Sequence, residues 1–128
     1  MIKYYFCLAF AVIVSLSSFA DELVLPQTQN PEAIWRLFPT QNIYAFLQLN
    51  TVTGQIYQLH FSTSGDDPGM IPLISKNLAE NEKEIPGRFT LYPTRNMYTF
   101  ILLDQIRGLS WHVQWNNDSS YRFCIPMP

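Results

Sequence analysis

The chain has 128 residues, of which 48% are hydrophobic and 14% charged, and its formal net charge is −2. The basic residues are scattered singly along the chain, which excludes a nucleic-acid-binding surface that neutralises several phosphates. A chain of this length builds one modest core and is too short for two domains of ordinary size.

The first 20 residues have the pattern of a cleavable secretory signal peptide. Lys3 gives a short positive start, residues 6–16 form an apolar stretch, and Ser18 and Ala20 are the small residues that specify cleavage. We expect export to the periplasm or the extracellular space, with one mature domain at 21–128; the alternative is an uncleaved N-terminal anchor. The apolar stretch is shorter than the roughly 20 residues that span a bilayer, so no stable membrane span is expected after cleavage.

Residues 21–33 contain Pro26 and Pro31 and show no periodicity, so we expect them to be extended and poorly ordered. Cys124 is the one cysteine that remains after cleavage, because Cys7 lies in the signal peptide. No intrachain disulfide can then form. The flanking residues Phe123 and Ile125 favour a buried thiol over a bond between chains.

Residues 35–73 repeat at 89–127 with a constant offset of 54 residues and no gap. Ten of the 39 aligned positions are identical, so we interpret the two segments as a duplicated unit. The identical pairs are Leu37/Leu91, Pro39/Pro93, Thr40/Thr94, Asn42/Asn96, Tyr44/Tyr98, Phe46/Phe100, Leu49/Leu103, Gly54/Gly108, Ile71/Ile125 and Pro72/Pro126. Four further positions exchange one aromatic ring for another, which preserves the volume that core packing requires.

Each unit reads as a short series of strands and turns. A leading strand (35–38; 88–92) ends at a Pro-Thr pair, and an apolar segment (42–49; 96–103) suits a central strand. A loop follows (50–54; 104–108) that opens with Asn or Asp and ends with Gly, as a hairpin loop built on a type I turn does.

The next segment of each unit (57–61; 111–115) alternates large apolar with polar residues at period two, which predicts a strand with one buried face. We expect the apolar residues to point inward and the polar residues outward. The inward set is then Tyr57, Leu59, Phe61, Trp111, Val113 and Trp115. A trailing strand ends at Ile71-Pro72 or Ile125-Pro126. The connector at 74–88 is charged and predicts a short helix or a solvated link.

The fold class expected from these elements is all-β. Two tandem antiparallel units of three or four strands each would pack as a pseudo-twofold sandwich or a small barrel, because a lone small sheet leaves one apolar face wet. We expect Asn42, Gly54, Asn96 and Gly108 to be structural turn residues. The Asn side chains can bond to the turn backbone, and the Gly residues can adopt a positive φ.

Two strings of the second unit are RFTLYPTRNMY at 88–98 and LDQIRGLSWHVQW at 103–115. They resemble a pattern that recurs, often twice per chain, in a family of small uncharacterised bacterial proteins. The first unit departs from the pattern, with Asn50 in place of the Asp and Tyr57 in place of the first Trp. No activity is attached to the pattern, so the resemblance supports the repeat and implies no function.

Few residues of the mature chain could carry chemistry. His60, His112 and Cys124 are too few and too scattered for a metal site, so we expect neither a metal nor a cofactor. A Cys124/His112 nucleophile pair has no helix N-terminus or Gly-rich elbow to present it, and we expect no catalytic residues. Asp66-Asp67 lacks the ligand spacing of a calcium loop and is interpreted as part of a polar hairpin loop.

Two features remain as candidates for binding. Exposed aromatic rings, above all Trp111 or Trp115, could form a stacking platform for sugars. A polar, uncharged strip on the outward strand positions could instead face another protein; its residues are Gln58, His60, His112 and Gln114.

We therefore expect an exported, non-enzymatic binding protein of the cell envelope whose partner is another protein. Its most concrete form is a periplasmic inhibitor or immunity-type protein. The alternatives are a carbohydrate-binding module with a glycan ligand and, third, a small secreted hydrolase.

Overall fold

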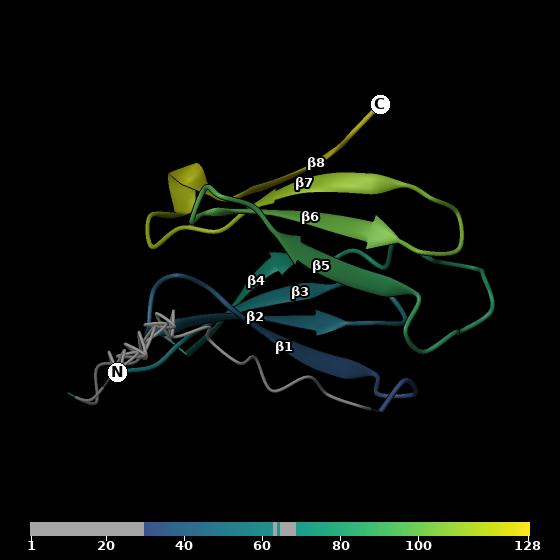
Figure 1. Cartoon of the computed structure of the whole chain (residues 1–128), viewed down its shortest axis with the longest axis horizontal. Helices are drawn as coiled ribbons and strands as arrows, with labels where there is room; N and C mark the ends of the chain where they lie inside the picture. Colours follow the sequence, from purple (N-terminus) through teal and green to yellow (C-terminus); the bar gives the residue numbers. More distant parts are fainter. Residues whose placement is uncertain (1–29, 63, 65–68) are drawn as a thin grey trace, which may run out of the picture.

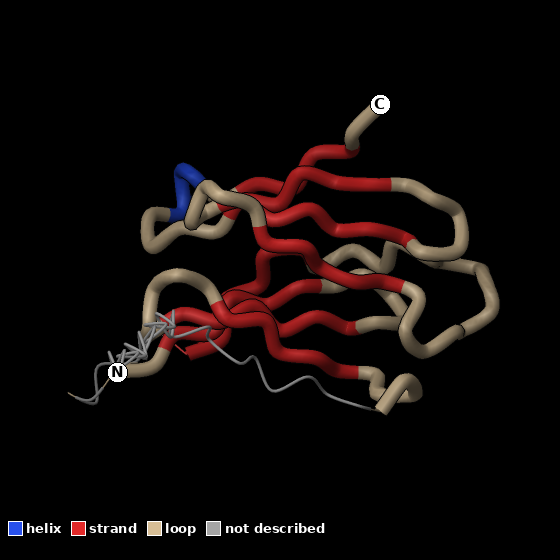
Figure 2. Tube along the Cα trace, viewed as in Figure 1, coloured by secondary structure: helices blue, strands red, loops and turns tan. Residues whose placement is uncertain are grey.

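The computed structural model describes residues 30–62, 64 and 69–128. The expected signal peptide, residues 21–29 and the Asp66-Asp67 loop lie outside the described residues. The described chain forms two four-stranded antiparallel sheets, which Figures 1 and 2 show stacked in two layers. The strands are β1 (Trp35–Pro39), β2 (Ala45–Asn50), β3 (Ile56–His60), β4 (Gly69–Ile74), β5 (Phe89–Pro93), β6 (Thr99–Asp104), β7 (Ser110–Gln114) and β8 (Phe123–Pro126), with a short 3₁₀ helix η1 (Ser119–Tyr121) before β8.

Each sheet is a meander in which strands that follow one another in the chain pair side by side, in the orders β1-β2-β3-β4 and β5-β6-β7-β8. The register is the same in both sheets: Ala45 pairs with His60, and the equivalent Thr99 pairs with Gln114. The prediction of an all-β fold with two tandem units is confirmed. The two sheets form an open sandwich, so the barrel alternative is not realised.

The β1–β2 turn of each unit is built by the identical residues of the repeat. The Thr40 hydroxyl donates to the carbonyl of Ala45 at 2.8 Å, and the amide oxygen of Asn42 accepts from the backbone N–H of Tyr44 at 2.9 Å. Thr94 and Asn96 make the same bonds in the second unit. Because these turns occupy 40–44 and 94–98, the central strands begin three residues later than expected.

The β2–β3 loops are also equivalent. The side chain of Asn50 accepts hydrogen bonds from the backbone N–H groups of Val52 and Thr53, and Asp104 does the same in the second loop. Gly54 and Gly108 close these loops with φ of 77° and 73°. Both glycines therefore have the left-handed backbone conformation that the loop requires.

The connector between the units contains no helix, and most of its residues are exposed, as predicted for a solvated link. It consists of turns that pack against the first hairpin loop: Leu78 donates its N–H to the carbonyl of Thr53 at 2.8 Å, and Phe89 donates to Thr51 at 2.8 Å. Ala79 is buried with the core. The connector and the start of the second sheet are thus bonded to the β2–β3 hairpin loop of the first sheet.

The core lies between the two layers, and each sheet contributes one face to it. The first sheet contributes alternate residues that include Ala45, Leu47, Leu49 and Ile56, and the second contributes a set that includes Phe89, Leu91, Phe100, Leu102, Val113 and Trp115. In the second unit the predicted inward set is confirmed, with Val113 and Trp115 fully buried and Trp111 packed against the core.

In the first unit the prediction for β3 is wrong. Ile56 and Gln58 face the core and are fully buried, whereas Tyr57 and Leu59 point away from the second sheet and Phe61, just beyond the strand, is exposed. The reversal is possible because the second sheet supplies hydrogen-bond partners for the Gln58 amide. The two units therefore bury opposite faces of the same repeat.

Candidate functional site

Gln58 and His60, half of the expected polar strip, lie at the interface between the sheets. Gln58 donates to the carbonyl of Asn116 at 3.0 Å, and the N–H of Asn116 donates back to the Gln58 side-chain oxygen at 3.3 Å. The His60 ring lies beside Gln58 and 6.2 Å from the ring of Trp115. Burial, and secondarily the charge of Arg122, lowers the pKa of His60. This half of the strip is a structural bridge between the sheets, in which Gln58 is fully buried and His60 is half-buried.

His112 and Gln114, the other half, lie on the outer side of the second sheet. The His112 ring packs edge-on against Phe123 with ring centres 4.8 Å apart, and its Nε2 atom is buried without a hydrogen-bond partner. The Gln114 amide donates to the carbonyl of Tyr121 at 2.9 Å. The four residues of the strip therefore do not share one surface: two lie on the inner side of the first sheet and two on the outer side of the second sheet.

Cys124 and His112 do not form a nucleophile pair. Cys124 pairs with Val113 in the β7–β8 ladder and packs against the core, while the neighbouring His112 faces the opposite side. Burial raises the pKa of the Cys124 thiol to about 11, so the thiolate is scarce at neutral pH. Within the described part of the chain, no group of three or more His, Cys, Asp and Glu residues is placed to hold a metal.

A buried ion pair between Arg88 and Asp104 was not predicted from the sequence. The Arg88 guanidinium donates to both carboxylate oxygens of Asp104, at 3.1 and 2.8 Å, and also contacts Glu82. Glu82 in turn pairs with Arg107 at 2.8 Å. Every charge in this group has an opposite charge as its partner, and the group surrounds the second hairpin loop. We interpret it as a structural clamp on that loop.

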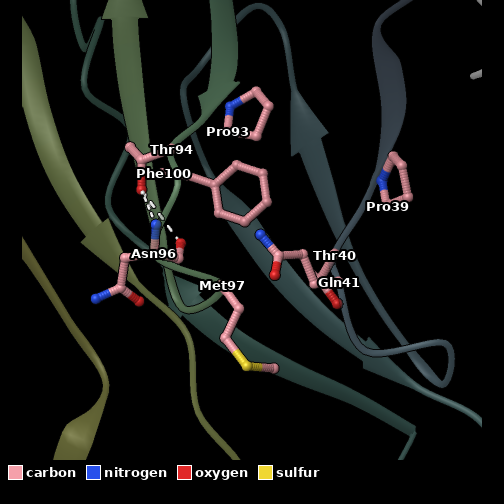
Figure 3. Close-up of a pocket in the computed structure, with 8 residues that line it drawn as sticks. All are labelled: Pro39, Thr40, Gln41, Pro93, Thr94, Asn96, Met97 and Phe100. Atoms are coloured by element: carbon pink, nitrogen blue, oxygen red, sulfur yellow. Dashed lines mark hydrogen bonds between the residues drawn. The ribbon is translucent and has the colours of Figure 1, made fainter. Parts of the chain in front are cut away.

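A hollow of about 210 Å³ opens between the equivalent Pro-Thr turns of the two units (Figure 3). The Phe100 ring and the Met97 and Gln41 side chains line it. Both threonine hydroxyls already donate to backbone carbonyls of their own turns. The hollow therefore offers apolar contact and little hydrogen-bonding chemistry.

The least expected surface is the outer side of the first sheet, which we call the first outer face. It carries the strand side chains that point away from the second sheet. They are Trp35, Leu37, Phe46, Gln48, Tyr57, Leu59, Phe61, Met70 and Pro72. None of these described positions holds a charged residue.

Rings and aliphatic side chains surround Gln48 on the first outer face. Trp35 lies 6.2 Å from Tyr57, and Phe61 lies 6.1 Å from Phe46, between ring centres. Leu37 is 56% exposed, and Trp35, Phe61 and Met70 are exposed to a similar degree. Sequence alternation placed Tyr57, Leu59 and Phe61 in the core, so this surface was missed.

The tryptophans named for a sugar platform are positioned differently from expectation. Trp115 is fully buried, and its indole N–H donates to the carbonyl of Met97 at 2.9 Å. Trp111 is half-buried, with its ring 6.2 Å from that of Phe89. Trp35 is the exposed tryptophan, and its ring is tilted by 45° to that of Tyr57. The ring of Trp35 and that of its half-buried neighbour Tyr57 therefore do not form one flat platform.

Comparisons of the chain with family models, with curated proteins and with solved structures found no match. Among the residues that the structure describes, no helix is long and apolar enough to cross a membrane.

Proposed function

We propose that this chain is an exported, non-enzymatic protein of the cell envelope that binds another polypeptide through its first outer face. The observation that carries the proposal is the composition and exposure of that face. Contiguous exposed apolar surface marks interaction sites in soluble proteins. Interface cores are enriched in aromatic residues and Met and depleted of charge, as this face is. An inhibitor or immunity-type protein is one form of such a binder.

Export is supported by the N-terminal pattern of residues 1–20, which has the order of charge, apolar stretch and small residues found in signal peptides. The absence of catalysis is supported by the chemistry of the described residues. The Cys124 thiol has a raised pKa, which makes its thiolate scarce, and it lies on the opposite side of the second sheet from His112.

A photoreactive residue in place of Leu37 tests the proposal in the cell. The exported protein carrying it is irradiated in the intact envelope, and crosslinked products are identified by mass spectrometry. The matched control carries the same residue in place of Ile106, an equally exposed apolar side chain in the second hairpin loop.

We expect a discrete protein-to-protein crosslink from position 37 and none from position 106. Crosslinks to lipid or glycan alone, or equal products from both positions, would refute the proposal.

A further inference from the structure

The inter-sheet interface joins two non-equivalent faces of the repeat. Leu49 is fully buried, while its repeat partner Leu103 is half-exposed on the outer side of β6. Leu37 is 56% exposed, while its repeat partner Leu91 is 3% exposed. One face of the first unit therefore contacts the opposite face of the second unit. A twofold axis would instead bring equivalent faces together.

The two units are related by a displacement along the stacking direction. The sheets lie in the same strand order, because β2 contacts β5 and β4 contacts β8. The equivalent strands β2 and β6 also run in the same direction (Figure 1). A displacement of this kind does not close on itself, so the same contact can be repeated by further copies.

The two stacked sheets of one molecule leave two outer faces without a partner. These outer faces are the repeat equivalents of the two inner faces that are buried against each other. The first outer face repeats the inner face of the second sheet, with apolar side chains at equivalent positions except Gln48, which corresponds to the core residue Leu102. The pairs are Trp35/Phe89, Leu37/Leu91, Phe46/Phe100, Tyr57/Trp111, Leu59/Val113, Phe61/Trp115, Met70/Cys124 and Pro72/Pro126.

The outer side of the second sheet, which we call the second outer face, carries the repeat equivalents of the inner face of the first sheet, with Thr99 and Ser110 in place of the core residues Ala45 and Ile56. The pairs are Tyr92/Phe38, Ile101/Leu47, Leu103/Leu49, His112/Gln58, Gln114/His60, Ile125/Ile71 and Met127/Leu73. Ile125 and Met127 are exposed. The molecule thus presents, on opposite sides, the two halves of an interface that it also contains inside.

The polar side chains of the buried interface also have repeat equivalents on the outer faces. Inside the molecule Gln58 bonds to the backbone of Asn116 across the interface. The repeat equivalent of Gln58 is His112, whose Nε2 atom is buried without a partner in the single chain. In a stack, the residue facing His112 is Ser62 of the next copy, the repeat equivalent of Asn116. The stack therefore places a polar side chain opposite His112, as the interface inside the molecule places Asn116 opposite Gln58.

We propose that the partner of the first outer face is a second copy of this chain, which docks through its second outer face. Repetition of this contact gives an open head-to-tail stack, which grows by about 20 Å per chain because packed sheets lie roughly 10 Å apart. This inference rests on the proposed function and adds the identity of the partner.

Two charge substitutions separate the two faces. Leu37→Lys blocks the first outer face, and Ile125→Lys blocks the second; both side chains are exposed, so the fold is retained. Ile106→Lys is the control, with the same chemical change at an exposed position on neither face. The proteins are expressed from the complete reading frame, purified at the N-terminus that the host leaves, and studied by sedimentation velocity over a wide concentration range.

We expect the mass of the native protein and of Ile106→Lys to rise with concentration without a plateau. Each blocked variant alone stays monomeric. An equal mixture of Leu37→Lys and Ile125→Lys forms a one-to-one heterodimer that grows no further, because each variant supplies the face that the other has lost. Met70→Lys and Met127→Lys replace either variant if circular dichroism shows that it is unfolded.

Two results would overturn the stack. A native protein that stays monomeric throughout removes the second copy as partner, while a position-37 crosslink to a different protein would leave the proposed function intact. A native protein that stops at a dimer, with Ile125→Lys dimerising equally well, shows pairing of two first outer faces. Crosslinking that finds no protein partner, together with a monomeric chain, refutes both proposals.

Discussion

Asp104 is held in its ionised form by the donors that surround it. Burial opposes ionisation of the carboxyl group, but hydrogen bonds from Arg88 and from the backbone N–H groups of Arg107 and Ile106 outweigh burial and lower its pKa. The folded protein therefore holds this proton less tightly than the unfolded chain, in which an Asp has a pKa of about 3.9.

We predict that Asp104→Asn lowers the free energy of unfolding at neutral pH by about 3 kcal/mol, because Arg88 loses the buried counter-charge that it contacts through both carboxylate oxygens. A lowered carboxyl pKa adds stability above the unfolded pKa, and that stability is lost as the pH falls through the folded pKa. The difference in the free energy of unfolding between the native protein and the variant should therefore become smaller below about pH 4. Urea unfolding of both proteins across the acidic range measures this difference. A stability difference that does not change with pH would contradict this explanation.

Gln58 illustrates what local sequence does not contain. The period-two pattern of 57–61 correctly indicates a strand, but the pattern alone does not say which face is buried. Gln58 is buried because Asn116, 58 residues later, offers both a carbonyl and an N–H. A partner so distant in the sequence leaves no local signal. The polar strip was predicted from this wrong orientation.

The hairpin loops are the elements that sequence reasoning predicts best. Their form depends on local chemistry: an Asn or Asp side chain bonds to the next turn of backbone, and a Gly four residues later adopts a positive φ. The leading strands β1 and β5 and the trailing strand β8 end at prolines for a similarly local reason, since proline donates no ladder hydrogen bond. The expected end of the first trailing strand at Pro72 is wrong: β4 continues to Ile74, because it lies at the edge of its sheet, where a proline is tolerated. The connector was predicted less well, because its turns are held by contacts with residues 51–54.

The equivalent loop residues Gly54 and Gly108 allow the cost of steric crowding to be measured separately from the cost of backbone strain. Both have a positive φ, so alanine costs about 1 kcal/mol of backbone strain at either site. A Cβ atom at Gly54 would also lie 2.9 Å from Leu78 and 3.1 Å from Phe89, whereas a Cβ atom at Gly108 meets nothing within 4 Å. We predict that Gly54→Ala destabilises the fold more than Gly108→Ala, by about 1 to 3 kcal/mol. Thermal and urea unfolding of the two variants check this difference, and equal losses would refute it.

At the scale of the whole molecule, the two units form sheets with the same strand order that bury different faces. The first sheet buries one face of the repeat and the second sheet buries the other. The period-two alternation of the sequence in both units is compatible with burial of either face. Sequence reasoning therefore predicted the strands and the two-layer fold, but it expected a twofold arrangement. The head-to-tail arrangement is what leaves an apolar face uncovered on the first sheet.

The most direct test of this arrangement compares identical residues of the repeat. Leu37→Cys and Leu91→Cys are made in a Cys124→Ser background and labelled with a thiol reagent at high dilution. We predict that position 37 reacts rapidly in the folded protein, and that position 91 reacts only when the protein unfolds, because these side chains are 56% and 3% exposed. Equal labelling rates at the two positions would mean that the units bury equivalent faces, and would contradict both the head-to-tail stacking and the open first outer face.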